Sequence, residues 1–210
     1  MLVNCDPVRH SPSPLKIAFV SGLSDPQTCA LSPEQQSFLS RVSAPDDFKV
    51  WSNFPYVATT RQPAAQTPLL RASWNNASQF LTAGRPWYRD AARRHLQSLV
   101  ASTDSLVLVT ISCGLEIVAR ALPGLVFEGQ LRVVAFGPVA LVSPDAPVLS
   151  ARGDKDYVSG LFVRGVDHVL QGVGHMDYMA SHEALELVNR CISSSTSVSP
   201  EPGTTARRPS

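Results

Sequence analysis

A serine, a cysteine and a glycine stand side by side where an apolar stretch of the chain ends and a helix-like stretch begins. The run Leu106–Val109 predicts a buried strand, and the residues that follow Gly114 predict a helix. Ser112 and Cys113 at the junction both carry side chains that can act as nucleophiles. A sharp turn from strand to helix holds its central residue in strained backbone geometry, so the junction is a candidate nucleophile site.

The residues two positions away from the nucleophile decide between these two side chains. A tight turn crowds these positions, so they must be small. With Ser112 at the centre they are Thr110 and Gly114, whereas Cys113 would have two bulky aliphatic residues there. Ser112 is therefore the predicted nucleophile, and Cys113 is predicted to contribute mainly its backbone N–H.

A serine hydroxyl needs a base beside it, and the base needs a group that orients it. The segment GVGHMDYM offers His175 directly after a predicted strand. The segment ARGDKDYVS offers Asp154 and Asp156 after the preceding strand. The chain order serine, aspartate, histidine is the order found in one hydrolase architecture.

Alternating strands and helices must bring these side chains together. Continuous apolar strands between amphipathic helices indicate an α/β fold, with a mostly parallel sheet of about six strands and helices on both faces. Ligands bind at the carboxyl ends of the strands in such sheets, which is where the candidate residues lie. No helix is predicted between the fourth and fifth strands. The predicted strands lie within residues 15–22, 48–57, 106–109, 130–139, 146–156 and 166–175, and the predicted helices within 32–42, 68–83, 87–102, 114–124 and 182–192.

These motifs resemble those of the α/β-hydrolase superfamily. T-x-S-x-G around Ser112 stands for the superfamily's G-x-S-x-G, and PVLSARGDKDYVS and GVGHMDY resemble its acid and histidine loops. The resemblance implies that Asp156, the second aspartate of G-D-x-D, is the acid, with Asp154 as a loop residue. It also implies an oxyanion hole formed by the backbone N–H groups of Cys113 and Leu23.

The resemblance covers residues 15–192, which form the predicted domain, and starts at the superfamily's third strand. The two leading antiparallel strands have no counterpart. Residues 58–86 form a short insertion near the cleft, and residues 1–14 and 193–210 are predicted to be flexible tails. Thr110 in place of the first glycine, and a loop after the first strand that lacks His-Gly, are departures from the pattern.

Three functional hypotheses follow. The leading one is a serine hydrolase that cleaves an ester or thioester of a small to medium acyl substrate through an acyl-enzyme. A C–C hydrolase or an acyltransferase could use the same triad. The third is a catalytically silent binding protein of the same fold, which Thr110 and the missing strands favour slightly and the intact triad disfavours.

Composition narrows the class of partner. The 210-residue chain is 44% hydrophobic and carries 18 Lys and Arg against 17 Asp and Glu, so nucleic acid and anionic membranes are not expected partners. No apolar run is long enough to span a membrane, and no export signal is recognised. The four cysteines are scattered, which favours a reduced, cytoplasmic protein. No cofactor or metal motif is present, and a monomer or homodimer is expected.

Overall fold

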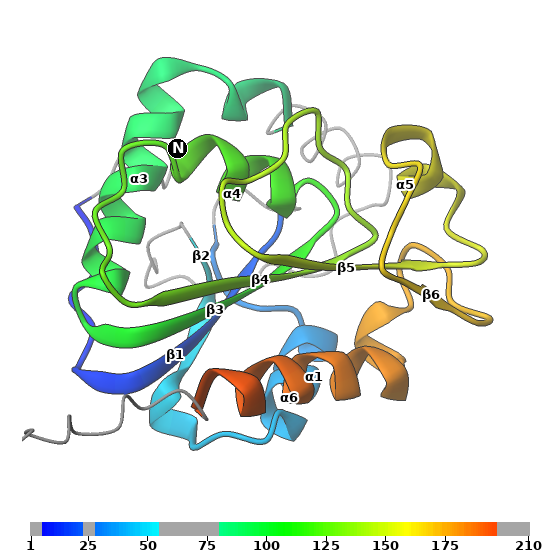
Figure 1. Cartoon of the computed structure of the whole chain (residues 1–210), viewed down its shortest axis with the longest axis horizontal. Coiled ribbons are helices and arrows are strands. Elements are labelled where there is room, and N and C mark those ends of the chain that lie inside the picture. Colours follow the sequence, from blue (N-terminus) through cyan, green and yellow to red (C-terminus); the bar gives the residue numbers. More distant parts are fainter. Residues whose placement is uncertain (1–5, 23–27, 55–79, 197–210) are drawn as a thin grey trace, which may run out of the picture.

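Six parallel strands form a single sheet in the order β2-β1-β3-β4-β5-β6 (Figure 1). The computed structural model describes residues 6–22, 28–54 and 80–196, with side chains up to 194. This sheet confirms the predicted parallel architecture. The strands are β1 Ser13–Val20, β2 Lys49–Phe54, β3 Thr103–Ile111, β4 Gln130–Phe136, β5 Val148–Gly153 and β6 His168–Leu170.

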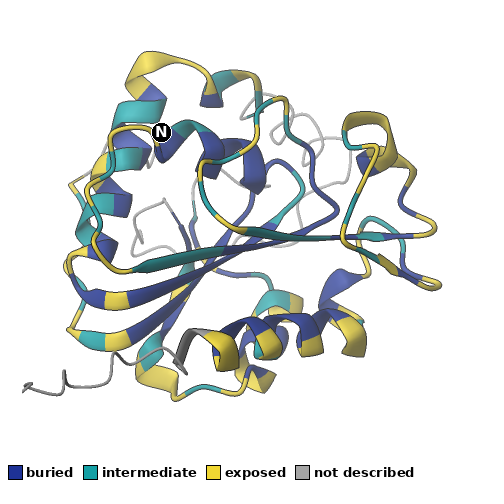
Figure 2. Cartoon of the chain, viewed as in Figure 1, coloured by how far each residue is buried: buried dark blue, intermediate teal, exposed yellow. Residues whose placement is uncertain are grey.

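Helices cover both faces of the sheet, and two short 3-10 helices lie in the connections. Helices α3 and α4 lie on one face, and α1 and α6 lie on the other (Figure 1). In Figure 2 the helices are buried toward the sheet and exposed away from it. The elements are α1 Pro33–Arg41, η2 Asp46–Phe48, α3 Pro86–Val100, α4 Gly114–Ala121, α5 Tyr157–Phe162, η3 Tyr178–Ala180 and α6 His182–Thr196.

The central strand β3 shows why the apolar runs in the sequence are continuous. Leu106 and Leu108 pack into the core under α3 and α4, while Val107 and Val109 pack into the core under α1 and α6. Both sets are fully buried. A strand that is covered on both faces needs apolar side chains at every position, as in other parallel sheets.

Local sequence signals determine where helix α1 begins. Helix α1 begins with a capping box, in which the Ser32 hydroxyl accepts from the Gln35 N–H and the Gln35 side chain accepts from the Ser32 N–H. Pro33 occupies the first turn of the helix, where its missing N–H costs nothing. These are the residues from which the helix was predicted.

One described α-helix was not predicted. Helix α5 begins directly after Asp156, whose side chain accepts from the Ser159 N–H as an N-cap. The six-residue segment YVSGLF lacks the periodicity of a longer helix, so pattern gave no signal for it. The connection from β4 to β5 contains no helix, as predicted.

Several sequence predictions fall partly outside the described residues. Of the helix predicted over 68–83, residues 80–83 are helical and the rest is not described. Most of the predicted insertion 58–86 and of the tail 193–210 also lies outside the described residues.

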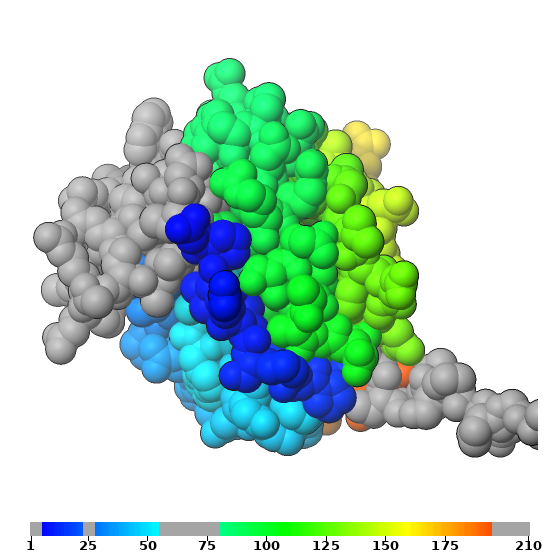
Figure 3. Space-filling model, turned by 90° about the vertical axis from the view of Figure 1, so that its left-hand side faces the viewer, coloured from blue at the N-terminus to red at the C-terminus, as the bar shows by residue number. Residues whose placement is uncertain are grey.

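Near the N-terminus, residues 6–12 lie along α3 (Figure 3). The Ser98 hydroxyl on this helix donates to the Val8 carbonyl at 2.8 Å.

No helix in the described ranges is both long enough and apolar enough to cross a membrane.

Candidate active site

The junction between β3 and α4 is a strained turn centred on Ser112. Ser112 has φ +53°, and it is the only residue other than glycine with a positive φ in the described part of the chain. Two hydrogen bonds hold this conformation. The Ser112 N–H donates to the Phe136 carbonyl at 3.1 Å, and the Ser112 carbonyl accepts from the Val139 N–H at 3.1 Å. Such a conformation costs about 1–3 kcal/mol and persists only where neighbouring structure enforces it.

Gly114 is required because α4 starts against the end of β1. A Cβ at this position would lie 1.9 Å from the Val20 carbonyl oxygen. This is the crowding that favoured Ser112 over Cys113 in the sequence. On the other side of the turn, Thr110 is accommodated, but its buried hydroxyl has no hydrogen-bond partner in the described residues.

His175 connects Ser112 to Asp156. Its Nε2 lies 3.1 Å from the Ser112 Oγ, and its Nδ1 lies 3.0 Å from Oδ1 and 2.9 Å from Oδ2 of Asp156. The carboxylate can only accept, so Nδ1 carries the hydrogen and Nε2 is free to accept from the serine hydroxyl. The imidazole is partly exposed, at 23%, while the Asp156 side chain is fully buried.

Asp156 is held as a carboxylate. Its Oδ1 accepts from the Ser159 N–H at 2.9 Å, and its Oδ2 accepts from the Tyr178 hydroxyl at 2.5 Å. Burial raises the pKa of the Asp156 carboxyl, but the hydrogen bonds from Tyr178, Ser159 and His175 more than offset this and hold the pKa below its ordinary value.

Asp154, the other candidate acid, has a different role. It is exposed, and its Oδ1 accepts from the Gly172 N–H at 2.7 Å. This bond joins the loop after β5 to the turn after β6. The imidazole Nδ1–H donates to Asp156 and not to Asp154.

One solved structure shares this arrangement of the elements. Esterase PE8, a solved crystal structure, matches with a TM-score of 0.53 at 17% sequence identity, over 90% of this chain and 96% of that chain. The chain has an α/β-hydrolase fold. A protein of unknown function from Agrobacterium tumefaciens, ATU1826, proposed to be an α/β hydrolase, matches at TM-score 0.43 and 17% identity over 92% and 94% of the two chains. No family model and no curated protein matches the sequence.

Of the two predicted oxyanion donors in this α/β-hydrolase fold, Cys113 lies in the described part of the chain. Cys113 follows Ser112 as the N-cap residue of α4, at the end of the helix that its dipole makes positive. Burial raises the pKa of the Cys113 thiol to about 11, which keeps the side chain protonated and a poor nucleophile at neutral pH. Leu23 lies outside the described residues.

Sequence patterns missed two residues that surround the acid. Tyr178 lies in η3, three positions after His175, and its hydroxyl donates a hydrogen bond to Asp156 Oδ2. Gly137, after β4, has φ +51°, and a Cβ there would lie 2.6 Å from the Asp156 Oδ2 and 2.7 Å from the Tyr178 ring. A tyrosine in a short loop carries no pattern of its own. The Gly-Pro after VVAF, which indicated only a strand end, was the one available signal for Gly137.

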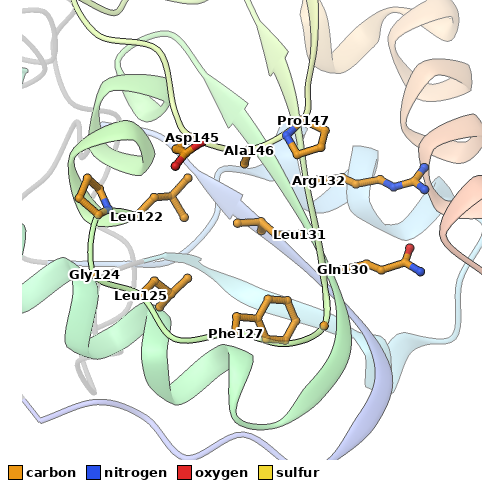
Figure 4. A pocket seen from close by; sticks show the side chains of 12 residues that line it. Leu122, Gly124, Leu125, Phe127, Gln130, Leu131, Arg132, Asp145, Ala146 and Pro147 are labelled. Atoms are coloured by element: carbon orange, nitrogen blue, oxygen red, sulfur yellow. The ribbon is translucent and has the colours of Figure 1, made fainter.

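A cavity of about 690 Å³ lies at the opposite end of the sheet, beside the start of β4 (Figure 4). Leu122, Leu125, Phe127 and Leu131 line it, with Asp145 and Arg132 at its edge. A second cavity, of about 440 Å³, lies between Arg132 and the α6 residue Leu187. Neither is lined by Ser112, Asp156 or His175. No group of three metal-ligating side chains occurs in the described ranges.

Proposed function

We propose that this chain is a serine hydrolase that cleaves an ester or thioester of a small to medium acyl substrate through an acyl-enzyme. One observation carries the proposal: a serine at positive φ is joined by hydrogen bonds through His175 to the buried carboxylate of Asp156. This is the arrangement that turns a weak hydroxyl nucleophile into a reactive one.

In the proposed mechanism, the Ser112 Oγ attacks the acyl carbonyl while His175 Nε2 takes the serine proton. Asp156 keeps the Nδ1–H tautomer in place and stabilises the imidazolium that forms. The backbone N–H of Cys113 and a second N–H, assigned to Leu23, stabilise the negative oxygen. A donor of this kind typically lowers the barrier by about 3–4 kcal/mol. His175 then gives its proton to the leaving group, and water releases the acyl group by the reverse steps.

Exposed apolar side chains that lie close to the triad residues in sequence support an apolar acyl group. Met176 directly follows His175 and is 79% exposed. Leu161 on α5 is 85% exposed. Large apolar side chains that remain in solvent beside a reactive centre are typical of a binding surface for an apolar group.

Turnover of activated esters and matching thioesters, over a series of acyl chain lengths, tests the proposal. Wild type should hydrolyse short and medium chains, and Ser112→Ala should show no turnover above the uncatalysed rate. Ser143→Ala, an exposed serine in the loop after β4, is the matched control and should behave as wild type. A folded wild type without turnover at any chain length would instead favour a catalytically silent binding protein. An acyltransferase would require an added alcohol or thiol acceptor for product formation.

A further inference from the structure

The Tyr178 hydroxyl forms two hydrogen bonds at the acid. It accepts from the Gly153 N–H at 2.9 Å and donates to the Asp156 Oδ2 at 2.5 Å. A carboxylate can only accept, so the phenolic hydrogen lies between the two oxygens. The last residue of β5 is thereby joined through the phenol to the acid that follows it.

The tyrosine ring has little freedom to move. Tyr178 is 1% exposed, and its ring stacks on Phe136 with a centroid separation of 5.8 Å and an interplanar angle of 25°. Gly137 passes so close that a Cβ would lie 2.7 Å from the ring. A glycine at positive φ therefore leaves the space that the phenol occupies.

The Asp156 carboxylate has one protein donor on each oxygen besides the imidazole. Ser159 N–H donates to Oδ1, and Tyr178 donates to Oδ2. Both oxygens then lie within 3.0 Å of the His175 Nδ1. Loss of the phenolic donor would leave Oδ2 with the imidazole alone and allow the carboxylate to rotate about its side-chain bond.

The phenol of Tyr178 is a neutral hydrogen-bond donor at neutral pH. Burial, together with the hydrogen bond to Asp156, raises the pKa of Tyr178 well above its ordinary value. A hydrogen bond to an ionised acceptor is roughly twice as strong as one between neutral groups.

We propose that Tyr178 is a positioning residue for the catalytic acid: its hydroxyl fixes the orientation of the Asp156 carboxylate and through it the imidazole of His175. The proposal rests on the proposed hydrolase function for its kinetic consequences. Tyr178 is buried and acts through Asp156, so it should affect the chemical step and leave substrate binding unchanged.

Tyr178→Phe removes the hydroxyl and keeps the ring. Hydrolysis of a short activated ester should show kcat about 10- to 100-fold below wild type, the range expected for a lost hydrogen bond to a charged group, with KM within twofold. Tyr157→Phe is the matched control, because its exposed hydroxyl also adjoins Asp156 in sequence, and it should keep the wild-type kcat. A wild-type kcat in Tyr178→Phe would overturn the proposal.

A double-mutant cycle separates positioning from a general structural role. In an Asp156→Asn background, Tyr178→Phe should lower kcat by less than twofold, because the carboxylate through which it acts has been removed. If Tyr178→Phe gives the same fold-loss in both backgrounds, the tyrosine acts independently of the acid and the proposal fails.

The proton resonance of His175 Nδ1–H provides a readout that does not need turnover. Tyr178→Phe should shift this resonance, whereas Tyr157→Phe should leave it in place. An inactive wild type whose resonance still responds to Tyr178→Phe would contradict the hydrolase function and keep the positioning role. An unchanged resonance would contradict the positioning role. If Tyr178→Phe does not fold, 3-fluorotyrosine at position 178 keeps the ring and hydroxyl and makes the phenol a stronger donor, so the resonance should again shift.

Discussion

The two ends of the sheet differ in what their residues are arranged to do. At the carboxyl ends of the strands, Ser112, His175 and Asp156 are joined by hydrogen bonds of 2.9–3.1 Å, and Ser112 is held at positive φ. At the amino ends of β4 and β5 lies a cavity of about 690 Å³ that is lined by both apolar and polar residues.

The difference shows that fixed polar geometry, more than empty volume, marks the candidate site in this protein. Parallel strands bring their carboxyl ends to one edge, where the following loops can place polar side chains. Helix ends and loops at the other edge only have to close the core. A large cavity there needs no chemistry, whereas a strained serine beside an oriented imidazole has no evident structural purpose.

Substitution of Asp156 is expected to have the largest effect on activity at the carboxyl ends of the strands. Asp156→Asn should lower kcat by about three to four orders of magnitude, because the amide no longer stabilises the imidazolium or the reactive tautomer. Steady-state hydrolysis of an activated ester measures the change. Asp154→Asn, two residues away and exposed, should stay within about tenfold of wild type. The opposite ranking would transfer the role of the acid to Asp154.

Gly114→Ala tests whether the turn geometry is enforced by packing. The added methyl group would meet the Val20 carbonyl at 1.9 Å, so α4 must move away from β1. Overpacking of this kind lowers the free energy of unfolding by about 1–3 kcal/mol. Denaturant unfolding measures it, and kcat should fall as the Cys113 N–H moves. Gly84→Ala has nothing within 4 Å of the new methyl group and should change neither quantity. Equal effects of the two changes would show that the turn is not tightly packed.

The ionised carboxylate of Asp156 also contributes to the free energy of unfolding. The pKa of Asp156 is lower in the folded protein than its ordinary value. Its ionised form therefore stabilises the fold fully above the unfolded value of about 3.9, and this contribution is lost as the pH falls through the lower folded value. The difference in free energy of unfolding between wild type and Asp156→Asn should be constant above about pH 5 and should shrink in more acidic solution. A difference that does not depend on pH would contradict the lowered pKa.

The smallest effect on activity is expected at the amino end. Phe127→Ala removes a half-buried ring from the lining of the larger cavity. It should lower the free energy of unfolding by about 1–2 kcal/mol, less than for a fully buried phenylalanine. Measured per folded molecule, kcat should stay within twofold of wild type. A large loss of kcat would mean that the two ends of the sheet are coupled.

The sequence predicted the parallel sheet and the triad candidates because both depend on local signals. Apolar runs marked β1, β3 and β4, and polar residues after three strands marked Ser112, Asp156 and His175. Spacing alone did not decide between Asp154 and Asp156, because both follow β5 by a few residues. The choice depends on which carboxylate is buried against the imidazole, a property of the packed loops.

Tyr178, Gly137 and helix α5 could not be predicted for related reasons. The Tyr178 hydroxyl meets Asp156 across 22 residues of chain, and only the folded loops bring them together. Gly137 is required by the ring beside it, which no local pattern reveals. Helix α5 is short and begins at the capping side chain of the acid itself.

Reaction with a fluorophosphonate, followed by intact-mass measurement and peptide mapping, tests the triad most directly. The wild type should gain one adduct, on Ser112, because the imidazole beside it activates this hydroxyl. Ser112→Ala should gain none, while Ser143→Ala should react at the wild-type rate. An adduct on another residue, or none on a folded wild type, would contradict the assignment of Ser112 as the nucleophile.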